Sequence, residues 1–252
     1  MQYVELDVAR TSMGLRLVLL GDIPSPWSEA ARIIFDLKKI PFIPVRYRID
    51  DDSVRQWTGV HNAPVAVYND EPPLSHWADL LALAERLEKR VPLIPGDREE
   101  RIAVLGHCHE IMGPMGLVWH TRLLLIHASL VTAGQCGFSV KVAEYLAKKY
   151  GYDADSINAS RERVRESFDR LALQIAQKAT LGREFLLSDR PTALDIYAAS
   201  ALGVLSPLPD DVCPLHPRIR RMLDSAAEHI GWAIPEELLA HREFVYRYCR
   251  KD

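Results

Sequence analysis

Short apolar runs alternate with an amphipathic helical pattern in the first ninety residues. One apolar run covers 15–20 and is followed by a proline-containing loop. Apolar residues then recur on one face at helical spacing, which predicts a helix; they are Trp27, Ala30, Ala31, Ile34 and Leu37. Two further β-like runs lie at 43–47 and 64–68, with a polar helix or loop at 50–57 between them. This pattern predicts a strand at 15–20, a helix, a second strand at 43–47 and a third strand at 64–68.

A turn at 69–73 follows the third predicted strand, and Ser75 could cap a helix over 76–87. Ahead of the first strand, apolar and polar residues alternate at 4–8, which permits an additional edge strand. Strands and helices therefore alternate throughout this part, which predicts an α/β domain.

Segment 91–97 contains two prolines and a glycine and cannot continue a helix, so it predicts an interdomain linker. We expect an α/β domain over 1–90, with 1–14 as an extension, and a second domain over 97–252.

The second domain is helical in pattern almost throughout, because apolar residues recur three and four positions apart. One such stripe comprises Ile102, Leu105, His109, Met112, Gly116, Trp119, Leu123 and Ile126, and another comprises Val164, Phe168, Leu171, Ala172, Ile175 and Ala179. Further helices are predicted at 140–149, 192–205, 216–230 and 236–249. We expect the stripes to face a core.

Pro64 stands at the mouth of the third predicted strand, where a residue without an N–H group is tolerated. The cis form of an X–Pro bond is only about 0.5–1 kcal/mol above trans. A cis Ala63–Pro64 bond would turn the N–H and C=O of Ala63 outward, and such an edge can pair with an extended peptide. The alternative is a proline that only starts a strand. We expect Ala63 to face a cleft between the two domains.

Thr192 and Asp195 are spaced as a capping box at the start of a predicted helix. The threonine side chain can accept from the amide three residues on, while the aspartate reaches back to the N-cap amide.

The pair Ala63-Pro64 and the Thr192/Asp195 box together resemble the glutathione transferase superfamily, over nearly the whole chain. The resemblance implies a thioredoxin-like α/β domain followed by an all-α helical domain. It also implies a cytoplasmic homodimeric enzyme that joins glutathione, as co-substrate, to a small hydrophobic electrophile.

Members of that family with a catalytic serine place it in the loop after the first strand, where Ser25 stands here, with Ser28 as a nearby substitute. A hydroxyl at a helix N-terminus would favour the glutathione thiolate, and lowering a thiol pKa by two units is worth about 2.7 kcal/mol. The alternative is that Ser25 is only a loop or cap residue. No cysteine lies between 21 and 32, which disfavours the thiol-transferase and dehydroascorbate-reductase branches.

The family's acid-Ser pair, which anchors the γ-glutamyl end of glutathione, is replaced here by His76 and Trp77. Backbone N–H groups at that helix start can still bind a carboxylate, but the acid is missing unless Asp79 or Glu71 reaches in. This departure favours the alternative of a non-catalytic binding or assembly module without glutathione affinity, or a dimer contact at these two residues. The glutathione-binding residues that the resemblance implies are Asn62, Ala63, Pro64, His76 and Trp77.

The resemblance places the electrophile pocket against the helix that opens the second domain. The candidate lining residues are Trp27, His109, Met112 and Trp119. The alternative for these side chains is ordinary core packing, and Gly113-Pro114 is typical of a kink. His107 and His109 are two residues apart and do not share a helix face, so we expect no metal site.

Composition narrows the function classes further. The 252 residues are 48% hydrophobic and 26% charged, with a net charge of −3 and no basic cluster, which argues against nucleic acid and anionic membranes as partners. No run of about 18 apolar residues and no signal-peptide pattern occurs. These two observations predict a cytosolic location. The four cysteines are widely spaced, which favours reduced structural thiols.

Overall fold

A three-stranded sheet forms the centre of the N-terminal part of the chain. The computed structural model describes residues 1–21, 23–49, 52–230 and 233–250. Strand β1 (Leu15–Leu20) lies in the middle, parallel to β2 (Phe42–Tyr47) and antiparallel to β3 (Val65–Tyr68). In register, Leu17 lies opposite Pro44 on one side and Ala66 on the other. The three predicted strands are confirmed.

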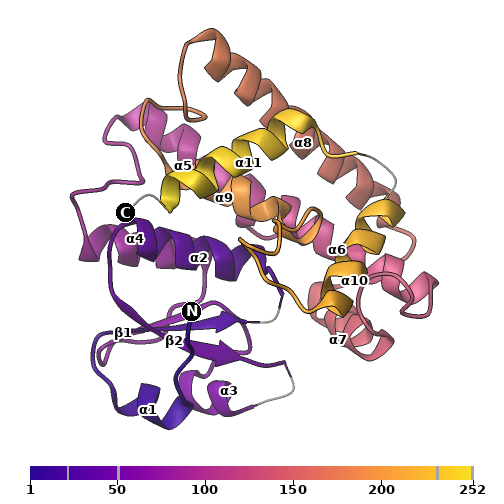
Figure 1. Cartoon of the computed structure of the whole chain (residues 1–252), viewed down its shortest axis with the longest axis horizontal. Helices are drawn as coiled ribbons and strands as arrows, with labels where there is room; N and C mark the ends of the chain where they lie inside the picture. The colour runs from indigo at the N-terminus through magenta and orange to yellow at the C-terminus, as the bar shows by residue number, and fades with distance from the viewer. Residues whose placement is uncertain (22, 50–51, 231–232, 251–252) are drawn as a thin grey trace.

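Helices cover both faces of the sheet (Figure 1). Since successive side chains of a strand point to opposite faces, the odd-numbered residues of β1 pack under α2 (Pro26–Leu37) and α4 (Trp77–Leu87). Val18 faces the other way, toward α1 (Leu6–Thr11) and α3 (Ser53–Thr58). The sheet therefore holds the start of α2 and the segment before β3 on a common frame.

The edge strand expected at 4–8 is wrong. Only Val4 pairs, through a single bridge to Val45, and the chain then turns into α1. Helical spacing places Ala9 of this helix, which is fully buried, in the apolar cluster against the sheet, and this packing outweighs the local alternation. The helix or loop expected at 50–57 is α3, and Asp50 and Asp51 of that expectation lie outside the described residues.

Helix α4 begins one residue later than predicted. His76 rather than Ser75 takes the N-cap position, and its Nδ1 accepts from the N–H of Ala78 at 3.4 Å. Just before this helix, Leu74 pairs with Ala66 of β3 through one isolated antiparallel bridge.

The rest of the described chain is helical, which confirms the predicted class. The elements are α5 (Arg98–Met112), α6 (Leu117–Val131), α7 (Val140–Tyr150), α8 (Ile157–Thr180), α9 (Ala193–Ala201), a 3-10 turn (Leu202–Val204), α10 (Pro217–Ile230) and α11 (Glu236–Cys249). No helix in the described ranges combines the length and apolar character needed to cross a bilayer.

The first predicted stripe does not form one continuous helix. The chain breaks between α5 and α6, where a Cβ on Gly116 would come within 2.6 Å of the Glu110 carbonyl oxygen. Before this break, Ile102 and His109 face solvent, while Val104 and Cys108 enter the core. The kink expected at Gly113-Pro114 is present.

The α/β and helical parts meet along α2. The indole Nε1–H of Trp27 donates to the carbonyl of Met112 at 2.9 Å, and the N–H of Ala193 donates to the carbonyl of Leu93 at 2.9 Å. The proposed division at 91–97 remains a prediction.

Candidate functional site

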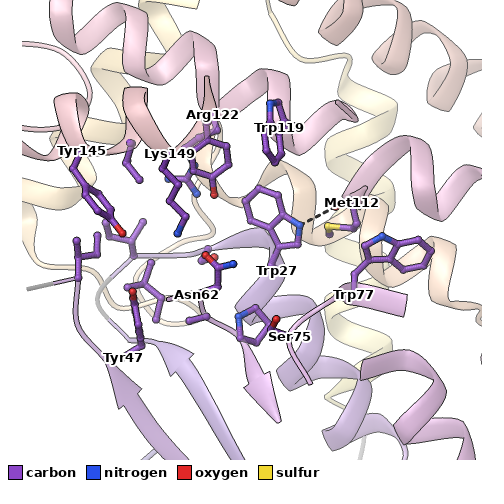
Figure 2. A pocket seen from close by; sticks show the side chains of 18 of the residues that line it. Trp27, Tyr47, Asn62, Ser75, Trp77, Met112, Trp119, Arg122, Tyr145 and Lys149 are labelled. Carbon is purple, nitrogen blue, oxygen red and sulfur yellow. Dashed lines mark hydrogen bonds between the residues drawn. The ribbon is translucent and has the colours of Figure 1, made fainter. Parts of the chain in front are cut away.

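A cavity of about 440 Å³ lies where the start of α2, the segment before β3 and helices α5 to α7 converge. Figure 2 shows Tyr145, Lys149, Arg122 and Trp119 on the side of the helical part, facing Tyr47, Asn62 and Ser75 on the side of the sheet. Most of the residues expected to form a site come together here.

Ser25 lines this cavity from the N-cap position of α2, with Pro26 as the first helical residue. Its backbone is fixed, because its N–H donates to the Ile23 carbonyl at 2.7 Å and its carbonyl accepts from the N–H of Glu29 at 2.8 Å. Its hydroxyl makes no hydrogen bond to any described residue and does not cap the helix. The hydroxyl is therefore available to a ligand.

Ser28 does not line the cavity. Its side chain is buried, and its hydroxyl oxygen accepts from the N–H of Leu20 at 3.1 Å. This bond ties the end of β1 to α2, so Ser28 supports the loop that presents Ser25.

The Ala63–Pro64 bond is cis, and both residues line the cavity. The N–H and C=O of Ala63 make no hydrogen bond to any described residue, because pairing with β1 begins only at Val65. This confirms that Ala63 presents a free peptide edge to a cleft. Asn62 also lines the cavity and is exposed.

His76 and Trp77 line the cavity, but Trp77 is also built into the core. Its side chain is buried against the ring of Tyr197, whose hydroxyl donates to the Trp77 carbonyl at 3.2 Å. Neither acid that could replace the missing anchor reaches the cavity, since Glu71 pairs with Arg86 and Asp79 is exposed elsewhere. The helix N-terminus remains, with the Ala78 amide already bonded to His76.

Three of the four expected pocket residues line the cavity, namely Trp27, Met112 and Trp119. His109 does not, because it projects to solvent before the break between α5 and α6. Tyr150 of α7 completes an aromatic wall, with its ring centroid 4.8 Å from that of Trp119 and 6.5 Å from that of Trp27.

The sequence did not predict that α7 lines the cavity, or that the cations Arg122 and Lys149 do so. The lining residues that were missed and that have polar or charged side chains are Tyr47, Ser75, Arg122, Tyr145, Lys149 and Tyr150. The signal for Arg122 was available, because it is the single formally charged residue in the mostly apolar run from 117 to 126. Nothing local indicated that α7 would fold over the cavity.

The electrostatics of the cavity are dominated by these cations. Burial lowers the pKa of Arg122, and burial together with the Arg122 charge lowers the pKa of Lys149. Burial also raises the pKa of Tyr150, and it raises the pKa of Tyr47 to about 12. The described lining contains no Asp or Glu, and no cluster of His, Cys, Asp or Glu in the described residues could hold a metal ion.

No family model and no curated protein sequence matches the chain. Solved structures do match it in fold. The glutathione S-transferase of Methylobacillus flagellatus with bound glutathione is 16% identical, with a TM-score of 0.58 over 94% of this chain and 98% of that one. The Methylobacterium radiotolerans glutathione S-transferase in complex with glutathione sulfonate is 20% identical, with a TM-score of 0.56 over 88% and 96%. Human glutathione S-transferase T1-1 is 17% identical, with a TM-score of 0.54 over 93% and 90%.

Proposed function

The chain has the glutathione transferase fold, and from this premise we propose that it joins glutathione to a hydrophobic electrophile in the cavity. One observation carries the proposal. The Ser25 hydroxyl and the Ala63 peptide edge line the same cavity, and neither has a partner among the described residues. A tripeptide thiol needs a hydrogen-bond donor for its sulfur and a backbone partner for its peptide. In this proposal the Ser25 hydroxyl is the donor and the Ala63 peptide edge is the backbone partner.

In this mechanism the cysteinyl backbone of glutathione pairs with the N–H and C=O of Ala63. The sulfur then lies at the N-terminus of α2, where the Ser25 hydroxyl donates to it and the helix dipole favours its negative charge. The thiol first gives its proton to solvent. The thiolate then attacks the electrophilic carbon with a sulfur lone pair, and as the C–S bond forms the leaving group departs with the electrons of the bond that breaks. Asn62 and the amides that follow His76 take the carboxylates of glutathione.

The alternative is a member of this fold that binds other partners and has no glutathione affinity. It is favoured by the absence of Asp and Glu from the described lining, which leaves the γ-glutamyl ammonium without a counter-charge. His76 also occupies the amide of Ala78 at the start of α4.

Calorimetric titration with glutathione separates the two readings. The proposal expects saturable binding in the millimolar range or tighter. A protein that is folded by circular dichroism but shows no heat of binding up to about 10 mM would leave the binding module as the function, since such a Kd corresponds to less than about 3 kcal/mol.

The Ser25→Ala variant tests the thiolate donor, with Ser28→Ala as its matched control three residues along the same helix. Ser25→Ala should leave glutathione affinity within a few-fold and slow conjugation by about a hundredfold, because one missing donor of this kind is worth about that much. The pKa of bound glutathione, followed by thiolate absorbance, should rise toward its free value. An unchanged rate in Ser25→Ala, with the loss confined to Ser28→Ala, would overturn the assignment of the donor to Ser25.

We also propose that the chain is a cytoplasmic homodimer, on the resemblance alone. Light scattering after gel filtration measures the molar mass in solution. A monomer mass across the working concentration range would overturn the proposal of a homodimer.

A further inference from the structure

Arg122 of α6 is a buried cation without a polar partner in the part of the chain that the structure describes. Its side chain is 7% exposed and forms no hydrogen bond or ion pair with any described residue. Its guanidinium carbon instead lies over three rings, at 5.4 Å from the centroid of Phe138, 5.9 Å from Trp27 and 6.0 Å from Tyr150.

The other buried lysine and arginine side chains in the described ranges all have oxygen partners. Lys38 donates to the Glu85 carboxylate and the Val91 carbonyl, Arg16 to the carbonyls of Gly14 and Asn69, and Arg242 to the carbonyl of Ser206. Arg122 is therefore exceptional among these buried basic residues, and it is the one that lines the cavity.

Aromatic faces compensate a guanidinium only in part. Each well-placed cation–π contact is worth about 0.5–2 kcal/mol, but five N–H donors in a rigid fork still need acceptors. Burying such donors unpaired is unfavourable. The guanidinium nitrogens of Arg122 are not among the polar atoms that are sealed from solvent without a partner, so the donors open into the cavity.

The charge around Arg122 is uncompensated as well. Lys149 lies on the same side of the cavity (Figure 2), and the described lining offers no carboxylate to either cation. Lys149 differs in being partly open to solvent and in donating to the His61 carbonyl at 3.2 Å. An anion that enters the cavity could therefore accept hydrogen bonds from the guanidinium N–H groups of Arg122, which have no partner among the described residues.

We propose that the electrophile carries a carboxylate on a planar aromatic body, and that Arg122 binds this carboxylate through its forked N–H groups. This rests on the proposed function, because it takes the cavity as the electrophile's site. The two carboxylate oxygens match the guanidinium fork, and Trp27, Trp119 and Tyr150 supply flat apolar surfaces for the ring.

A carboxylated aryl chloride such as 4-chloro-3,5-dinitrobenzoate fits this description. The glutathione thiolate attacks the ring carbon that bears chlorine, so a C–S bond forms and the C–Cl bond breaks. Chloride leaves with the bonding electrons, the carboxylate is unchanged, and no oxidant or reductant takes part.

Equilibrium binding tests the anion site without any reaction. Calorimetry compares naphthalene-2-carboxylate with naphthalene-2-carboxamide, which has the same ring and no charge. We expect the wild-type protein to bind the carboxylate at least about tenfold more tightly, Arg122→Lys to keep part of this preference, and Arg122→Met to lose it. Lys149→Met should retain it, and Lys148→Met is the matched surface control on α7.

Equal affinity of the wild-type protein for the two ligands overturns the inference, and this measurement needs no variant to fold. A preference that survives in Arg122→Met but disappears in Lys149→Met overturns the assignment to Arg122.

Kinetics then separates this inference from the proposed function. The ratio of kcat/KM for 4-chloro-3,5-dinitrobenzoate to that for 1-chloro-2,4-dinitrobenzene should fall about tenfold in Arg122→Met. A wild-type protein that conjugates neither substrate but prefers the naphthoate would refute the transferase proposal and leave the anion site standing. Conjugation of both substrates, with an unchanged kcat/KM ratio in Arg122→Met, would support the transferase proposal and refute the anion site.

Discussion

Asp195 is fully buried, and three hydrogen-bond donors converge on its carboxylate, with His241 Nε2 also 3.3 Å from Oδ1. They are the N–H of Leu186 at 2.9 Å, the N–H of Thr192 at 2.9 Å and the hydroxyl of Thr192 at 3.0 Å. The capping box expected from the spacing is present at the start of α9. The aspartate thus closes the helix and also holds the preceding loop.

Replacement of Asp195 with alanine should destabilise the protein by about 3 kcal/mol or more, because buried N–H donors lose their acceptor in addition to the cap. Asp97→Ala is the matched control, since Asp97 caps α5 by accepting from Glu99 and Glu100 at an exposed site. That change should cost only about 1 kcal/mol. Urea unfolding measures both, and equal losses would refute the role of burial.

His120 and His107 give stability a pH dependence. Burial lowers the pKa of both, with Arg163 adding to the effect at His120 and Arg170 at His107. The unfolded chain, with a histidine pKa of about 6.5, therefore takes up these protons before the folded chain does. Stability should fall as the pH drops below about 6.5 and level off below the folded-state pKa values.

Unfolding free energies between pH 7.5 and 5.5 measure this effect. His120→Gln and His107→Gln should each make the fall shallower, and an unchanged slope in both variants would show that other groups cause it.

At the scale of elements, the sequence predicted those strands and helices whose position depends on the local pattern of apolar residues. Apolar runs with proline-bearing boundaries identified β1, β2 and β3, and the periodic segments identified the later helices. Helix α1 was missed because tertiary packing of Ala9 decides it. The break between α5 and α6 divided one apparent stripe. Before the break, Leu105 and Met112 face the core as predicted, whereas Ile102 and His109 do not.

The candidate site was predictable on the α/β side and less so on the helical side. Ser25, Ala63 and Pro64 belong to short local motifs, so their convergence follows from the sheet order. Arg122 and Lys149 reach the cavity only through the packing of α6 and α7, which depends on contacts distant in sequence.

The buried ion pair between Lys38 and Glu85 joins the end of α2 to α4. The lysine side chain is wholly buried, its Nζ lies 2.8 Å from Glu85 Oε1, and the same oxygen accepts from the N–H of Leu93 at 3.0 Å. Glu85→Ala should cost about 3 kcal/mol, because it leaves a buried charge with only the Val91 carbonyl.

Glu71→Ala removes the exposed pair with Arg86 and should cost no more than about 1 kcal/mol. Thermal melting of the two variants side by side checks this contrast, and similar melting temperatures would contradict it.

At the scale of the whole molecule, one apolar cluster joins the two parts of the chain. It contains Ile34 of α2, Leu81 of α4 and Ile196 of α9, together with Leu93 of the connecting segment. Either part alone would expose its share of this surface to water. The α/β part should therefore depend on the helical part for its stability.

We expect a single unfolding transition, with equal calorimetric and van't Hoff enthalpies. A fragment of residues 1–90 should lack a cooperative melt of its own. Two resolved calorimetric peaks, or a fragment that melts cooperatively, would show that the domains are independent.

Three of the five tryptophans, Trp27, Trp77 and Trp119, line the cavity. Trp57 lies on the opposite face of the sheet, beside α1. Trp232 lies outside the described residues. Among the four tryptophans that the structure describes, the intrinsic fluorescence is therefore concentrated around the candidate site. An electron-poor aromatic guest would quench this emission as it enters, while Trp57 would continue to emit. Occupancy of the cavity can thus be followed in real time and without a label, even for ligands that never react.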